Sequence, residues 1–164
     1  MSVQVYPRFR GQTPVAYASY SDSSTQNLTS SVVTYVKFNT VEAQQYISVQ
    51  NDGLGNPTKI VVADSGVFSF TLSPQLIHGG AGSTIVDFWV EVNGAAAART
   101  ASRLELPNNT ETLPYIEIIL TLTAGAAVQW AFYTTGSNVS IYATAAAPPI
   151  PAAPSAIASV KQIQ

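Results

Sequence analysis

The feature that most constrains the fold is a run of strict alternation that ends in a turn. In residues 84–92, four apolar side chains alternate with three others: Val86, Phe88, Val90 and Val92 against Asp87, Trp89 and Glu91. A period of two places the first set on one face of a β-strand and the second set on the other. Asn93-Gly94 follows directly, and this dipeptide is the strongest short signal for a hairpin. The segment therefore predicts a half-buried strand that leads into a hairpin turn.

Similar short runs recur along the chain at the spacing of roughly 8 to 12 residues that is typical of all-β sandwiches and barrels. We expect further strands at residues 14–20, 32–38, 46–49, 58–62, 67–72, 102–106, 115–122, 128–133, 139–143 and 155–163. The one helical alternative, residues 94–103, is too short to matter alone. The apolar faces of the best alternating runs predict a core between two sheets, made by Val86, Phe88, Val90, Ile118, Leu120, Trp130 and Phe132.

A length of 164 residues suits one domain. Residues 1–13 show no strand pattern and are expected to form an N-terminal arm, which leaves residues 14–164 as the folded domain. Residues 145–154 are rich in Ala and Pro, so we expect an extended connector before the last strand, because proline cannot sit inside a sheet. The first ten residues lack the apolar centre of a signal peptide, and no apolar run is long enough to span a membrane.

Charged residues make up only 10% of the chain, against roughly 25% in an average domain. Two interpretations explain the low charge. The chain is either a rigid scaffold whose polar surface consists of hydroxyl and amide side chains, or a subunit whose surface is largely buried against other copies of itself. The second is favoured, because a monomer so poor in charge tends to associate. The net charge of -2 argues against nucleic acid as the main partner, and the lack of cysteine removes disulfides and thiolate chemistry.

The sequence does not assemble a recognisable catalytic or metal site. His78 is the single histidine, it lies in a glycine-rich segment that predicts a surface loop, and no Gly-x-Ser-x-Gly elbow surrounds any serine. Asp87 and Glu91 share one face of a strand. Paired carboxylates can serve a glycosidase or bind calcium, but the favoured interpretation of this pair is an ordinary polar outer face. We therefore expect no enzyme activity, no cofactor and no metal.

Three segments in this order resemble the tumour necrosis factor-like jelly roll, as in complement-type globular heads: residues 64–70, residues 86–94 and residues 120–130. In that family a strand with Gly-x-Phe precedes one that ends in Asn-Gly, and a later strand runs into Leu-x-Ala-Gly-Asp-x-Val. Here Ala126 replaces the aspartate of the last motif, so any role of that acid is absent.

The tail, residues 148–160, resembles the ending of a group of jelly-roll proteins encoded by bacteriophages, particularly marine ones. Together the two resemblances cover roughly residues 12–163. They imply an all-β jelly-roll sandwich, a three-fold assembly with aromatic residues along its axis, and a structural role in the virion. No catalytic residues are carried over.

We therefore predict a homotrimeric capsid decoration or cement protein that binds the major capsid protein or other virion proteins, without nucleic acid or membrane partners. The alternative is a fibre-tip or adhesin module that binds a host surface glycan. Aromatic side chains expected at the trimer interface are Trp89, Tyr115, Tyr133 and Tyr142. The arm residues expected to attach to the capsid are Tyr6, Arg8, Phe9 and Arg10.

Overall fold

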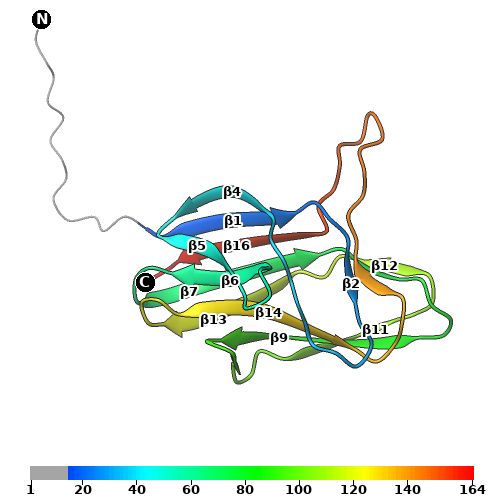
Figure 1. Cartoon of the computed structure of the whole chain (residues 1–164), viewed down its shortest axis with the longest axis horizontal. Helices are drawn as coiled ribbons and strands as arrows, with labels where there is room; N and C mark the ends of the chain where they lie inside the picture. Colours follow the sequence, from blue (N-terminus) through cyan, green and yellow to red (C-terminus); the bar gives the residue numbers. More distant parts are fainter. Residues whose placement is uncertain (1–14) are drawn as a thin grey trace, which may run out of the picture.

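The computed structural model describes residues 15–164, and in this range it consists of β-strands and connecting turns without a helix (Figure 1). The strands form three sheets, and every named strand pair is antiparallel. The described part of the chain thus offers no helix that is able to cross a membrane. The expected all-β class is confirmed.

Two larger sheets face each other as a jelly-roll sandwich. The five-stranded sheet has the order β13-β7-β16-β1-β4, with bounds β1 (Tyr17–Asp22), β4 (Thr40–Gln45), β7 (Gly66–Pro74), β13 (Ile116–Leu122) and β16 (Ala156–Gln162). The seven-stranded sheet has the path β10-β9-β14-β6-β5, with β11 beside β9 and β3 beside β14. Its strands are β3 (Thr34–Tyr35), β5 (Ile47–Asn51), β6 (Pro57–Val62), β9 (Thr84–Val92), β10 (Ala95–Ala96), β11 (Ser102–Leu106) and β14 (Ala127–Thr134).

A four-stranded sheet continues the five-stranded one. Its order is β12-β8-β15-β2, with bounds β2 (Gln26–Leu28), β8 (Leu76–His78), β12 (Thr110–Thr112) and β15 (Val139–Ile141). Strand β8 follows β7 after the single residue Gln75, and buried side chains continue to alternate from Leu72 to His78 without a change of side. The outer sides of these two sheets are therefore one continuous surface.

The core lies between the two large sheets and confirms most of the predicted set. Val86, Val90, Trp130 and Phe132 are fully buried, and Phe88 is 7% exposed. Ile118 and Leu120 face the same way from edge strand β13 but are only partly buried. They are less covered because an edge strand has a neighbour on one side alone.

Local turn chemistry was predicted well. Asn93 and Gly94 both have positive φ, at 53° and 79°, as a two-residue hairpin turn of type I′ requires. Strands β9 and β11 have the predicted bounds, and β13, β14 and β16 differ by one or two residues from them. The helical alternative over residues 94–103 is wrong, because Ala95 and Ala96 pair with β9 instead.

Five strands were not predicted: β2, β4, β8, β10 and β12. They lie in polar or glycine-bordered segments, and they form because other segments, distant in the chain in every case but β10, supply hydrogen-bond partners. The predicted strand over residues 32–38 shrinks to the two residues of β3. The connector over residues 145–154 lies outside the sheets, as expected.

Candidate functional surfaces

His78 is a structural residue of the core. It belongs to β8, is 2% exposed, and its Nδ1 atom lies 3.1 Å from the carbonyl oxygen of Pro107. The prediction that it sits in a surface loop is wrong, because Leu76 and His78 alternate inward with the core side chains of β7. Within residues 15–164, no group of three or more His, Asp or Glu side chains is arranged to hold a metal ion.

The outer face of the seven-stranded sheet carries a polar and aromatic network in which the groups bond to one another. The Tyr35 hydroxyl donates to Glu91 Oε2 at 2.8 Å, and the Trp89 indole donates to Glu91 Oε1 at 3.2 Å. Burial, and then the bond to Glu91, raise the pKa of Tyr35. Glu91 is thus held by two neighbours of its own chain, so the interpretation of this face as an ordinary polar surface is favoured.

Asp87, the other outward carboxylate of β9, is engaged by Arg103. Two hydrogen bonds join them, from Nε to Oδ1 at 2.7 Å and from Nη2 to Oδ2 at 3.0 Å. The guanidinium lowers the pKa of Asp87. Tyr133 on β14 lies opposite Asp87 in the register and is half-buried. Trp89 and Tyr133, two of the four predicted interface residues, therefore share this face.

The other two predicted interface residues lie on the opposite side of the molecule, on a surface that we call the long face. It is the continuous outer side of the five-stranded and four-stranded sheets. Its exposed large apolar side chains are between 39% and 67% exposed and are Tyr17, Leu113, Tyr115, Ile119, Tyr142 and Ile157. Strand pairing places Ile119, Ser69, Lys161 and Tyr17 in one row across four strands.

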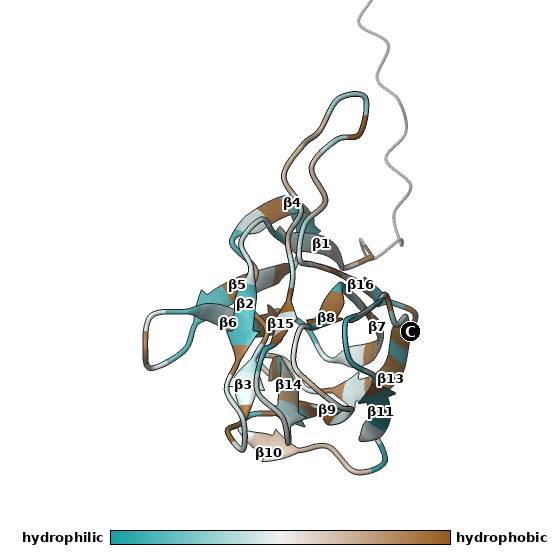
Figure 2. Cartoon of the chain, turned by 90° about the vertical axis from the view of Figure 1, so that its right-hand side faces the viewer, coloured by the Kyte–Doolittle hydropathy of each residue, from teal (hydrophilic) through white to brown (hydrophobic). Residues whose placement is uncertain are grey.

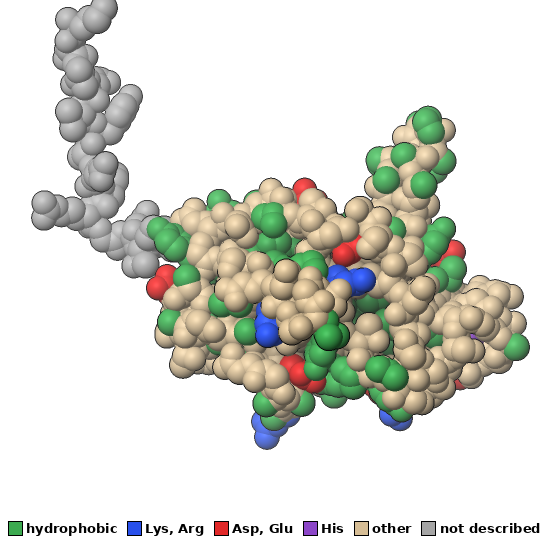
Figure 3. Space-filling model, viewed as in Figure 1, with side chains coloured by type: hydrophobic (Ala, Val, Ile, Leu, Met, Phe, Trp, Pro, Cys, Tyr) green, Lys and Arg blue, Asp and Glu red, His purple; other side chains and the backbone are tan. Residues whose placement is uncertain are grey.

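A hairpin, residues 144–154, projects away from the body between β15 and β16 (Figures 1 and 2). Backbone hydrogen bonds between Thr144 and Ala153 and between Ala147 and Ile150 hold its two arms together. It contains Ala, Pro and one Ile beyond its first residue, and it has no charged residue. Ile150 near the tip is 66% exposed, and Figure 3 shows apolar side chains along the projection.

The base of this hairpin is tied firmly to the sheets. The Tyr142 amide donates to the carbonyl of Gln75 at 2.7 Å, and the Gln75 side chain donates to the carbonyl of Pro154. The Ser155 amide donates to the carbonyl of Asp22 at 2.7 Å. The hairpin is therefore anchored on both arms, while its tip stands free.

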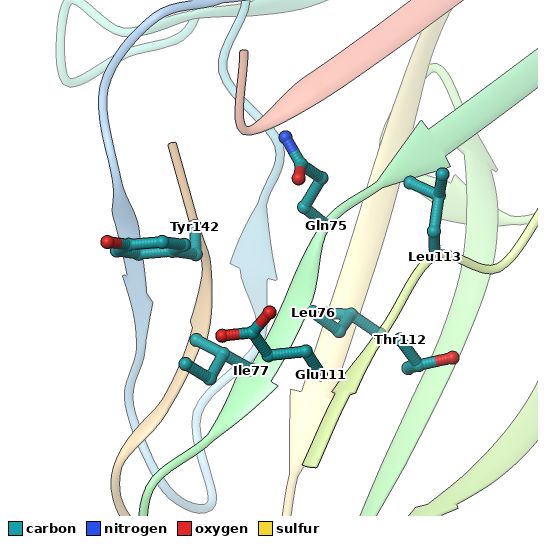
Figure 4. Close-up of a pocket in the computed structure, with 7 residues that line it drawn as sticks. All are labelled: Gln75, Leu76, Ile77, Glu111, Thr112, Leu113 and Tyr142. Atoms are coloured by element: carbon teal, nitrogen blue, oxygen red, sulfur yellow. The ribbon is translucent and has the colours of Figure 1, made fainter. Parts of the chain in front are cut away.

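A hollow of about 200 Å³ lies on the long face close to the hairpin base (Figure 4). Its lining comes from β8, from β12 and the residue after it, and from the residues beside the hairpin: Gln75, Leu76, Ile77, Glu111, Thr112, Leu113 and Tyr142. Glu111 and Ile77 face each other across the β12–β8 pair. The sequence signal for this site was weak, because β8 and β12 are short and were not predicted.

The predicted attachment residues Tyr6, Arg8, Phe9 and Arg10 lie outside the residues that the structure describes. Their role stays a prediction. The same holds for the boundary between the arm and the domain.

Comparisons with known proteins establish the fold. No protein-family model matches the sequence, and no curated protein matches it. Among solved structures, murine APRIL at pH 5.0 superposes with a TM-score of 0.57 at 10% identity, covering 92% of this chain and 100% of that one. The globular domain of the zebrafish complement 1qA protein superposes with a TM-score of 0.55 at 13% identity, covering 92% and 98%. The chain thus has the tumour necrosis factor-like jelly-roll fold.

Proposed function

We propose that this protein is a homotrimeric structural component of a virion, which decorates or cements the capsid. The observation that carries the self-association is the long face, where six exposed large apolar side chains line one continuous sheet surface. Ser69, Glu117 and Lys161 lie among these side chains, and a surface that combines large apolar and aromatic side chains with polar ones is typical of protein interfaces. The low charge of the chain, 10% of its residues, supports burial of much of its surface in an assembly.

A three-fold ring uses two different surface patches of each subunit, one for each neighbour. The long face supplies a patch with Tyr115 and Tyr142 from the predicted interface set. Trp89 and Tyr133 lie on the outer face of the seven-stranded sheet, on the opposite side of the subunit. In this proposal they are therefore not part of the patch that the long face supplies.

The oligomeric state is tested by light scattering coupled to gel filtration at micromolar concentration. We expect a mass about three times the chain mass of 17.3 kDa. Ile119→Lys places a charge on the long face, at edge strand β13, and should shift the mass toward the monomer. Leu54→Lys is the matched control, because Leu54 is 88% exposed on a turn of the other sheet. A monomeric parent protein contradicts the proposal.

The virion role rests on the resemblance of residues 148–160 to phage jelly-roll endings and is tested separately. Purified protein should bind virions that lack it and should co-sediment with them. We propose that Tyr6, Arg8, Phe9 and Arg10 supply the attachment, since arginine and aromatic residues are enriched where proteins meet. Deletion of residues 2–12 should then leave a folded trimer that no longer binds. Binding by the truncated protein places attachment elsewhere on the molecule.

The glycan-binding alternative stays a prediction. A glycan array probed with the purified protein tests it, and it would assign a fibre-tip or adhesin role in place of capsid decoration.

A further inference from the structure

We propose that the hairpin of residues 144–154 in one subunit docks into the hollow around Leu113 and Tyr142 of the next subunit. This inference rests on the proposed self-association and names the contact that closes the ring. The partner is therefore a second copy of this chain.

The first step of the argument is the chemistry of the hairpin. Residues 145–152 are all exposed, and they comprise only Ala, Pro and Ile. Ile150 presents a branched apolar side chain near the tip, 66% exposed. An uncharged projection of this kind gains free energy when a partner removes it from water, because burial of apolar area is favourable.

The second step is the complementary chemistry of the hollow. Ile77, Leu113 and Tyr142 supply its apolar and aromatic wall, and Figure 4 shows the Tyr142 ring at one side with Leu113 across from it. Proline-rich extended segments dock on aromatic-lined grooves, because their backbone is already ordered before binding. Glu111 also lines the hollow and is exposed in the single subunit.

The third step is placement. The residues that line the hollow do not include any member of the hairpin, whose tip leads away from the body. The hairpin of the same subunit therefore leaves the hollow open. The contact joins different residues of two copies: repeated head-to-tail it closes into a ring when the rotation permits, whereas a reciprocal pair of contacts would close a two-fold dimer.

The fourth step is the rigidity of the base. Gln75 lines the hollow and also bonds at both ends of the hairpin, through its carbonyl to Tyr142, two residues before the hairpin, and through its side chain to Pro154, its last residue. The two patches are thus held at a constant separation within each subunit. A pre-organised projection loses less conformational entropy on docking than a flexible loop does.

The natural chain has no cysteine, which makes a cross-linking experiment clean. The variant Ile150→Cys with Leu113→Cys carries one thiol on the hairpin and one in the hollow. Mild oxidation should join neighbouring subunits into a covalent trimer on non-reducing gels, because a disulfide forms when the two Cα atoms are within about 7 Å. The controls are each single variant and the pair Ile150→Cys with Leu54→Cys. None of them should form the covalent trimer.

The outcomes separate this inference from the proposed trimer. A covalent trimer in the double variant alone supports the docking. A trimer by light scattering that does not cross-link overturns the docking and leaves the trimer intact. A monomeric parent overturns both.

A charge pair gives an independent test. Ile150→Glu should weaken self-association by about tenfold or more, the loss expected when one anchor of an interface is removed. Adding Leu113→Lys should recover part of that loss if the two positions meet across the interface. Circular dichroism checks that each variant folds. A folded Ile150→Glu protein that associates as tightly as the parent contradicts the proposal.

Discussion

The most direct test of the sandwich core is the substitution Phe88→Ala. Phe88 lies on β9, is 7% exposed, and stacks on Phe132 of the neighbouring β14 with ring centroids 5.7 Å apart and planes 29° apart. Truncation removes a buried ring and leaves a cavity, which costs about 3–5 kcal/mol in closely packed cores. Of this loss, about 0.5–1.5 kcal/mol belongs to the aromatic pair itself.

The measurement is the free energy of unfolding from a denaturant titration at one fixed protein concentration, because self-association adds to apparent stability. Leu54→Ala, at a residue that is 88% exposed, should change that free energy by less than about 0.5 kcal/mol. A double-mutant cycle with Phe132→Ala isolates the ring pair. A loss below about 1 kcal/mol for Phe88→Ala would refute the assignment of Phe88 to the core.

Three further predictions concern titration and metals. Arg103 lowers the pKa of Asp87, so the ion pair stabilises the fold above pH about 4, and this contribution is lost as the pH falls below that value. Asp87→Asn should therefore make the free energy of unfolding less dependent on pH in the acid range. An unchanged pH dependence speaks against the pairing. Burial raises the pKa of Tyr20 to about 12, so stability should fall as the pH rises from about 10. In a titration of tyrosine absorbance with rising pH, Tyr20→Phe should remove the phenol that ionises at the highest pH. An unchanged titration curve would contradict this. A chelator should leave the melting temperature unchanged, since residues 15–164 hold no metal-binding cluster; a fall that calcium reverses would disprove it.

Much of the fold could be predicted because β alternation is a local property. Whether Val86 and Val90 share a face depends only on their spacing along one strand, and Asn93-Gly94 dictates its turn through backbone conformations that these two residues adopt easily. The sequence by itself therefore determined the all-β class, the inward faces of β9 and β14, and the exclusion of the proline-rich segment from the sheets.

The tertiary structure alone decided which distant strands pair. The glycine-rich segment around His78 predicts a loop, but β8 pairs with both β12 and β15, and that pairing buries the His78 side chain. Likewise, Leu113 and Tyr142 meet in one hollow because strands far apart in the chain are neighbours in the four-stranded sheet. Strand order and register depend on contacts between remote segments, which the spacing of residues along a single strand does not encode.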